Sequence, residues 1–148
     1  MASSRIVSAE RIIPAPRHQL FEIVATPALH SVIDGSGSVQ AIVTGPDRLA
    51  LGVQFGASMR IGVGYKVTNT VSAFVEDECI AWHHFAGFVW SYAFSDVEGG
   101  TKVVERFDYS NLLGLGIAFT PTPKRNQQNM AKTLERLERY ALTGSAEA

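Results

Sequence analysis

The sequence has little cysteine, no excess of charge of either sign and no long apolar run. Its single cysteine, Cys79, cannot form a disulfide within the chain, and a metal cluster built from several cysteines is excluded. Lysine and arginine number 13 against 14 acidic residues, which gives a net charge of −1. This balance is atypical of proteins that bind nucleic acid through a basic surface. No segment approaches the ~20 apolar residues of a membrane-spanning helix. We therefore expect no nucleic-acid partner and no integral membrane segment.

What the chain has instead is a globular composition. Its 148 residues are 46% hydrophobic and 18% charged, which predicts one domain with a sizeable core. The first residues show no basic region followed by an apolar run of signal-peptide length. We therefore expect a cytoplasmic protein with a single domain over residues 1–148. We expect it to be ordered over about 5–142, with a small polar tail at 143–148.

The patterning predicts a strand, two helical pieces, a strand meander and a long helix. Arg5 to Ile13 is rich in β-branched residues and precedes a proline, as strands often do. Pro14 to Pro27 and Pro27 to Ile33 read as helical pieces bounded by prolines. From Ser38 to Ser110 apolar residues alternate and short turn signals recur, which predicts about six antiparallel strands. Pro121 to Leu142 carries an apolar stripe at helical spacing, formed by Met130, Leu134, Leu137 and Ala141.

A sheet with one buried face alternates apolar and polar residues, so the strands can be assigned inward-facing side chains. In the strand from Cys79 to Phe85, the size of Trp82 favours Ile80, Trp82 and His84 as the inward set. The opposite face of this strand (Cys79, Ala81, His83 and Phe85) remains an alternative. The inward sets of the other strands are Val53, Phe55, Ala57, Met59 and Ile61; Tyr65, Val67, Asn69, Val71 and Ala73; Phe88, Trp90, Tyr92 and Phe94; and Val103, Glu105, Phe107 and Tyr109.

The turns between strands predict which residues lie opposite each other. A two-residue turn at Glu76 and Asp77 pairs Val75 with Glu78, and the same register places Asn69 opposite His84. A four-residue turn over residues 97–100 predicts the pairs Asp96–Thr101, Tyr92–Glu105 and Trp90–Phe107.

The inward face of this sheet combines many aromatic side chains with a few polar ones, namely Asn69, His84 and Glu105. A core that only fills space does not need such groups, because burying them costs free energy. An apolar pocket with a few convergent polar groups is typical of a ligand site. We therefore predict a site for a small apolar or aromatic molecule, with no cofactor and no metal. The predicted ligand-binding residues are Phe55, Met59, Asn69, Trp82, His84, Trp90, Tyr92, Glu105, Phe107, Tyr109 and Met130.

Several motifs also resemble those of a known family. They are AERIIPAPRHQLFEIVATPALHSVIDGSG at Ala9 to Gly37, IAW at Ile80 to Trp82, WSYAF at Trp90 to Phe94 and GGT at Gly99 to Thr101. With these, nearly the whole chain resembles the polyketide cyclase/dehydrase-like branch of the SRPBCC superfamily, which is related to START domains and the birch-pollen allergen fold. The resemblance implies an α+β helix-grip fold, in which a curved antiparallel sheet of about seven strands wraps around a long C-terminal helix. Two short helices follow the first strand, and a hydrophobic cavity lies between sheet and helix. The resemblance supplies no shared catalytic motif, so no catalytic residue is assigned.

Glu105 has two interpretations. It can contact a ligand hydroxyl or act as a general base, with its pKa raised by desolvation. Alternatively it lies at the cavity mouth, paired with a basic side chain or water. The same cavity admits a rival function, a polyketide cyclase or dehydratase that uses His84 or Glu105 as its base.

Other polar residues favour structural interpretations. His83 and His84 point to opposite faces of their strand, and Cys79 lies ~13 Å from His83 along it, so no zinc site is expected. His30 and Asp34 are one helical turn apart and form a dyad, or else Asp34 organises the turn that follows it.

The apolar segment Leu112 to Phe119 separates the last strand from the long helix. Its functional interpretations are a gate or a surface for a membrane or partner, which admits a regulatory partner-binding domain as a third function. Its structural interpretations are a loop folded on the core and a homodimer contact.

Overall fold

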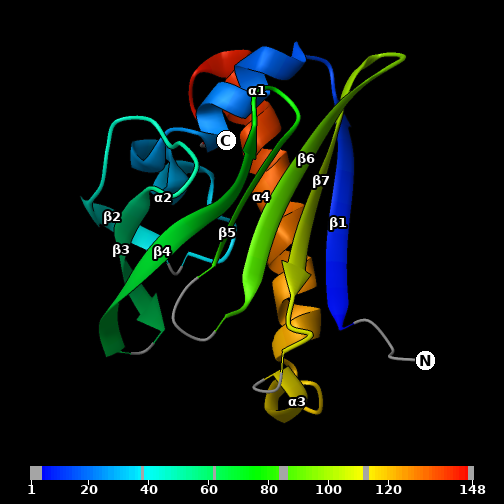
Figure 1. The fold of residues 1–148 in the computed structure, drawn as a ribbon. Helices are drawn as coiled ribbons and strands as arrows, with labels where there is room; N and C mark the ends of the chain where they lie inside the picture. The colour runs from blue at the N-terminus through cyan, green and yellow to red at the C-terminus, as the bar shows by residue number, and fades with distance from the viewer. Residues whose placement is uncertain (1–4, 38, 62, 84–86, 112–113, 147–148) are drawn as a thin grey trace.

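A computed structural model of the protein describes residues 5–37, 39–61, 63–83, 87–111 and 114–146 (Figure 1). The strands are β1 (Ile6–Ile13), β2 (Val39–Thr44), β3 (Gln54–Ile61), β4 (Val63–Val75), β5 (Cys79–His83), β6 (Val89–Val97) and β7 (Gly100–Asp108). The helices are α1 (Arg17–Val24), the short 3-10 helix η1 (Pro27–Leu29), α2 (His30–Ile33), α3 (Gly114–Ile117) and α4 (Thr122–Thr143).

The seven strands form one antiparallel sheet in the order β1-β7-β6-β5-β4-β3-β2. Strands β2 to β7 follow one another as a meander, and β1 closes beside β7. The long helix α4 packs against β1 and β7, with α1 near its C-terminal end and α3 at its N-terminal end (Figure 1). The predicted α+β helix-grip fold is therefore confirmed, including the short helices after the first strand.

The register of β6 and β7 agrees with the prediction. Val97 pairs with Gly100, so the turn itself contains two residues, Glu98 and Gly99, while the offset between the strands is the one expected. A short turn fixes this offset locally, which is why alternation and turn length were sufficient to find it. The observed pairs include Asp96–Thr101, Tyr92–Glu105 and Trp90–Phe107.

The register of β4 and β5 near their turn differs from the prediction. Val75 pairs with Cys79 rather than Glu78, because the turn contains three residues and Asp77 adopts a positive φ of 61°. An irregularity between Val71 and Ala73 then compensates for the extra residue. As a result Phe74 packs against the core, whereas the predicted inward set of this strand contained its neighbour Ala73. The expected partner of Asn69, His84, lies outside the described residues.

The core consists of two clusters of buried side chains. The larger one, here called the main cluster, joins the sheet to α1 and to Leu134 and Leu137 of α4. Ile80 belongs to this cluster and Trp82 packs against it. The inward face of β5 is therefore the predicted one, which contains Ile80 and Trp82. The second cluster contains Phe107, Tyr109 and Met130, with partly buried residues of β1, β6 and the α3 region packed around them. The apolar stripe of α4 thus contacts both clusters.

Helix α4 ends in a left-handed turn. Gly144 has a φ of 78°, and its N–H donates to the carbonyl of Tyr140 at 2.8 Å. The chain then folds back so that Ala146 is buried, and Arg139 donates from Nη1 to the Ala146 carbonyl at 3.1 Å. In the part of the chain that the structure describes, no helix has both the length and the apolarity needed to cross a membrane.

The grip of α4 on the sheet can be tested at Leu134, whose side chain is 1% exposed. The substitution Leu134→Ala should lower the free energy of unfolding by roughly 2–5 kcal/mol, because it removes buried methyl groups and leaves a cavity. Leu142→Ala on the same helix is the matched control, since Leu142 is 52% exposed and should shift the denaturant midpoint little. Equal effects of the two substitutions would contradict the packing described here.

Candidate functional site

The structure distributes the predicted ligand-binding residues over both clusters. Asn69 and Glu105 are buried polar residues between the apolar ones, and Met59 is half-buried. His84 lies outside the described residues. Those in contact with the main cluster are Phe55, Trp82 and Tyr92, and those of the second cluster are Trp90, Phe107, Tyr109 and Met130.

Glu105 lies where the two clusters meet. On β7 it stands between inward-facing Val103 of the main cluster and Phe107 of the second, and its side chain is buried with 4% exposure. It pairs across the sheet with Tyr92 on β6 and Ala9 on β1, and it hydrogen-bonds with the Tyr92 hydroxyl. Within the described residues, its second oxygen, Oε1, has no hydrogen-bond partner.

This environment favours the neutral form of the Glu105 carboxyl. Loss of solvation on burial raises the pKa of Glu105 to about 8, and the charge of Asp34 acts in the same direction. The Tyr92 hydrogen bond opposes the shift but is the smaller effect. The pKa of Tyr92 is in turn raised well above 10, mainly by burial, so its hydroxyl stays protonated. At neutral pH the site therefore holds two protonated groups side by side.

This geometry bears on one part of the structural interpretation of Glu105, its pairing with a basic side chain. No described cation lies within ion-pair distance of its carboxylate, so the alternative with a basic partner does not apply to the described residues. What remains is a buried carboxyl with an unused acceptor atom amid aromatic rings. Such a group can donate a hydrogen bond to a carbonyl or hydroxyl oxygen, or accept one from a hydroxyl.

The aromatic side of the site includes a histidine that sequence patterning did not place there. The ring of His30 stacks on Trp82 with centroids 5.2 Å apart, and it meets Phe55 edge-on at 5.5 Å. His30 Nε2 donates to the carbonyl of Val24 at 2.8 Å. Burial lowers the pKa of His30, so at neutral pH it serves as a neutral ring of the apolar wall. Its position in a short helix gave no periodic signal from which this contact could be predicted.

The second cluster supplies another group of rings. Trp90 and Phe107 lie 4.5 Å apart between centroids, and Phe107 stacks on Tyr109 at 5.4 Å. Phe88 meets Phe107 edge-on at 5.7 Å. Because these rings are in close contact, a ligand that binds between the clusters has to displace or tilt some of their side chains. The internal cavity expected from the sequence therefore stays a prediction.

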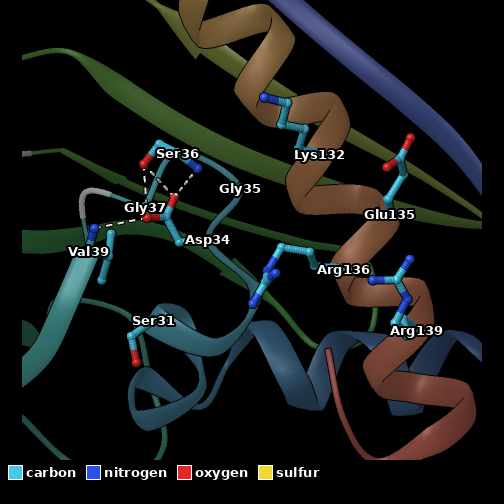
Figure 2. Close-up of a pocket in the computed structure, with 10 residues that line it drawn as sticks. All are labelled: Ser31, Asp34, Gly35, Ser36, Gly37, Val39, Lys132, Glu135, Arg136 and Arg139. Carbon is cyan, nitrogen blue, oxygen red and sulfur yellow. Dashed lines mark hydrogen bonds between the residues drawn. The ribbon is translucent and has the colours of Figure 1, made fainter. Parts of the chain in front are cut away.

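Asp34 organises the turn between α2 and β2, as one of the two sequence interpretations expected. Its Oδ1 accepts from the Ser36 N–H at 3.0 Å and its Oδ2 from the Val39 N–H at 2.8 Å (Figure 2). The turn docks closely on α4, because the Gly35 N–H donates to Thr133 Oγ1 at 2.8 Å. A Cβ at Gly35 would lie 2.6 Å from the Asn129 carbonyl, so this contact requires glycine. No dyad with His30 forms, since His30 bonds elsewhere.

A surface pocket of about 630 Å³ lies between this turn and α4 (Figure 2). It combines three cationic side chains with two acidic ones, so its charges largely offset one another. No sequence pattern indicated this pocket, because its two walls are nearly a hundred residues apart in the chain. Its lining residues are Ser31, Asp34, Gly35, Ser36, Gly37, Val39, Lys132, Glu135, Arg136 and Arg139.

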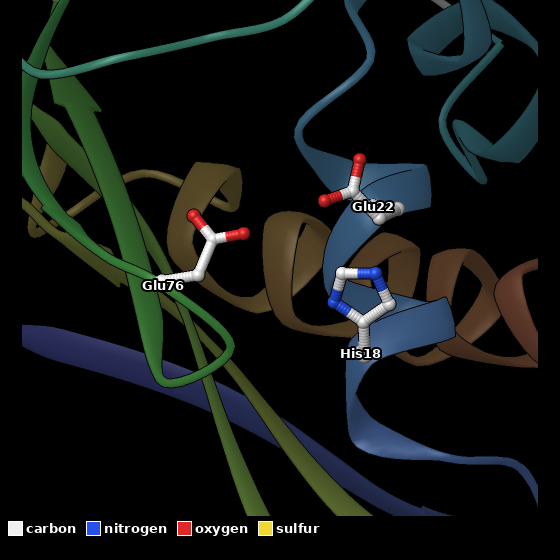
Figure 3. A group of neighbouring side chains, drawn as sticks. All are labelled: His18, Glu22 and Glu76. Atoms are coloured by element: carbon white, nitrogen blue, oxygen red, sulfur yellow. The ribbon is translucent and has the colours of Figure 1, made fainter.

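A second surface cluster brings together His18, Glu22 and Glu76 (Figure 3). Their ligand-type atoms lie within 4.8 Å of one another, a spacing that a metal ion can use. However, the guanidinium of Arg48 already pairs with both glutamates, at 2.5 Å and 2.6 Å. His18 Nδ1 lies 2.8 Å from Asp77 Oδ1, and this contact raises the pKa of His18. The cluster therefore fastens α1 to the β4–β5 turn.

Comparison with known proteins identifies the family. The model of the family described as polyketide cyclase/dehydrase and lipid transport matches residues 4–142, and the chain belongs to this family. The uncharacterized protein Rv0088 of Mycobacterium tuberculosis is 34% identical over 143 residues, which cover 91% of this chain and 64% of that protein. The chain thus spans less than two thirds of that relative's length.

Solved structures share the fold at low sequence identity. The AHSA1-like protein from Aeromonas hydrophila superposes with a TM-score of 0.71 and 19% identity, covering 96% of this chain and 95% of that one. The Aha1 dimer from Colwellia psychrerythraea gives 0.69 and 14%, with 94% and 97% covered. These likenesses establish the fold. The homodimer expected from the sequence stays a prediction for this chain.

The raised pKa of Glu105 makes a prediction for stability. In the unfolded chain the carboxyl titrates near its ordinary pKa of 4.5, whereas in the native protein it holds its proton up to about 8. The native state therefore binds more protons between these values, and the contribution of Glu105 to the free energy of unfolding falls as pH rises through that window. Glu105→Gln removes this dependence, and at pH 8 it should raise the free energy of unfolding by on the order of 3 kcal/mol relative to wild type.

Denaturant melts of wild type and Glu105→Gln at pH 5, 6, 7 and 8 measure this difference. Taking the difference between the variants cancels the opposite effect of His30, whose lowered pKa costs stability on the acidic side. A Gln variant that is less stable than wild type at pH 8, with the loss shrinking on acidification, would mean that a cation stabilises the ionised carboxylate.

Proposed function

We propose that this family member binds a small apolar or aromatic molecule between its sheet and helix α4. The bound molecule carries a carbonyl or hydroxyl group that hydrogen-bonds to Glu105. Phe55, Trp82 and Tyr92 contact it on one side of that carboxyl, and the second cluster contacts it on the other. The family description, which includes lipid transport, supports an apolar ligand of this kind.

One observation carries the proposal, namely the unused Oε1 atom of a carboxyl that is buried among aromatic rings. Burying a polar atom without a partner costs roughly 1–3 kcal/mol, and an isoleucine or leucine would fill the same space without that cost. A ligand with a hydroxyl or carbonyl group would remove the cost on binding. Because the rest of the surrounding wall is apolar, its remaining contacts favour an apolar body.

A dehydratase or cyclase is the second candidate, favoured by the pKa of about 8 at Glu105. A general acid or base works best when its pKa lies near the working pH. Turnover of a β-hydroxy ketone by wild type, with its loss in Glu105→Gln, would show that the carboxyl acts on the substrate as well as binding it.

Tryptophan fluorescence tests the binding proposal, because the two tryptophans, Trp82 and Trp90, contact the two clusters. Titration with 2-acetylnaphthalene, an aromatic ketone, should quench or shift their emission. Above pH 8 the affinity of wild type should fall by about tenfold per pH unit, since the ionised carboxylate no longer donates to the ketone. Glu105→Gln keeps an N–H donor but does not titrate, so its affinity should be constant from pH 7 to 9.

Two comparisons complete this experiment. The hydrocarbon 2-ethylnaphthalene has a similar shape without an acceptor, so at pH 7 it should bind wild type more weakly than the ketone. Trp82→Phe and Trp90→Phe should each alter the affinity for the ketone. If the ketone leaves the emission unchanged up to its solubility limit, and native mass spectrometry finds no small molecule on the purified protein, the proposal is wrong.

A further inference from the structure

The segment that follows β7 presents two large apolar side chains to solvent. The segment, here called the α3 tip, comprises residues 114–119. The Ala118 N–H donates to the Gly114 carbonyl at 3.0 Å, which closes the single turn of α3. The exposed side chains of Leu115 in α3 and of Phe119, two residues beyond its end, are here called the apolar face of the tip. They are 47% and 92% exposed, while Ile117 and Ala118 pack against the second cluster.

The α3 tip is firmly attached to the body of the protein. Arg5 donates from Nε to the Tyr109 carbonyl at 3.1 Å and from Nη2 to the Asn111 carbonyl at 2.9 Å. Asn111 Oδ1 accepts from the Gly114 N–H at 2.9 Å. A Cβ at Gly114 would lie 1.6 Å from the Tyr109 carbonyl oxygen, so the approach is possible only for glycine. Gly114, Ile117 and Ala118 thus anchor the backbone that carries Leu115 and Phe119 to the rest of the protein.

Positive charge accompanies the apolar face. Lys124 and Arg125, in the first turn of α4, are exposed, and no described carboxylate lies within ion-pair distance of either. Asp108 is the acidic residue at this end of β7, and its Oδ1 accepts a hydrogen bond from the Ser110 N–H at 2.9 Å. The guanidinium of Arg5 adds a further cation at the same end of the sheet.

We propose that the α3 tip docks on the surface of a bilayer that contains anionic lipids. Phe119 and Leu115 enter the interface, and Lys124 and Arg125 lie against the lipid phosphates. Such a combination of apolar side chains with neighbouring cations is the pattern of peripheral membrane binding. The place of the tip at one pole of the molecule, beyond the ends of the strands, lets it reach a flat surface (Figure 1).

A bilayer fits this face better than a protein partner does. A specific protein interface buries about 800 Å² on each side, whereas two side chains on one short segment offer far less apolar area. A bilayer needs no complementary shape, and it needs only the apolar insertion and the charge that are present here. This inference does not depend on the ligand, because it concerns a different surface and a different binding partner.

Sedimentation with vesicles tests the inference on the full chain. Wild type should bind vesicles of phosphatidylcholine with 25% phosphatidylglycerol more tightly than pure phosphatidylcholine, and added salt should weaken binding. Phe119→Ser should reduce the partition coefficient about tenfold because it removes the inserted ring. The double variant Lys124→Gln/Arg125→Gln should reduce it by about tenfold or more on the anionic vesicles alone.

Matched controls lie on α4, away from its N-terminal end. Leu142, near the C-terminal end of the helix, is 52% exposed, and Lys132 on the same helix is also exposed. Leu142→Ser and Lys132→Gln should leave vesicle binding unchanged. Melting temperatures should stay close to wild type in every variant, because the substituted side chains are all exposed.

Three results would overturn the inference. The first is an absence of wild-type binding to the anionic vesicles, and the second is equal binding by Phe119→Ser and wild type. The third is a wild-type dimer in sedimentation equilibrium that Phe119→Ser converts to monomer without any change in vesicle binding. That third result would assign the α3 tip to a contact between two copies of this chain.

Discussion

The pairing of β1 with β7 is the interaction on which the rest of the structure depends. It brings the first strand beside the last one, from Ile6 opposite Asp108 to Ile13 opposite Thr101, and the Thr101 hydroxyl donates to the buried Ala15 carbonyl at 2.8 Å. The two strands together form the surface against which α4 packs. The same pairing covers one flank of Glu105 with Ala9, whose methyl group offers no hydrogen bond. Closure of the sheet therefore creates both the grip on α4 and the dry environment of the carboxyl.

The polar groups around Glu105 share a common electrostatic setting. Tyr92 hydrogen-bonds with the carboxyl, and Asp34 adds a negative charge near enough to raise the pKa of both groups. Asp34 itself is held by the backbone of its turn, and that turn is fastened to α4 through Gly35. Asp34 thus belongs both to the lining of the surface pocket and to the groups whose charge raises the pKa of Glu105.

The two clusters differ in how they are covered. The main cluster is closed by α1 and α2, and its rings, including His30 and Trp82, contact one another closely. The second cluster is covered by the α3 tip, whose outer face is apolar and exposed. An apolar molecule that reaches Glu105 from a membrane would meet the second cluster first. The proposed ligand site and the proposed docking surface therefore adjoin the same cluster.

The sequence pattern was sufficient to predict the order of elements, the inward faces of β5, β6 and β7, and the apolar stripe of α4. These features follow from periodicity and from short turns, which act between residues close in the chain. For the same reason it placed Tyr92 opposite Glu105, the pair at the centre of the candidate site. The packing of the folded chain, in contrast, stacks His30 on Trp82, lets Asp34 raise the pKa of Glu105, and leaves that carboxyl without a described cation beside it. Those contacts join segments far apart in the chain, and their formation depends on how the short helices pack on the sheet, for which local patterning carries no signal.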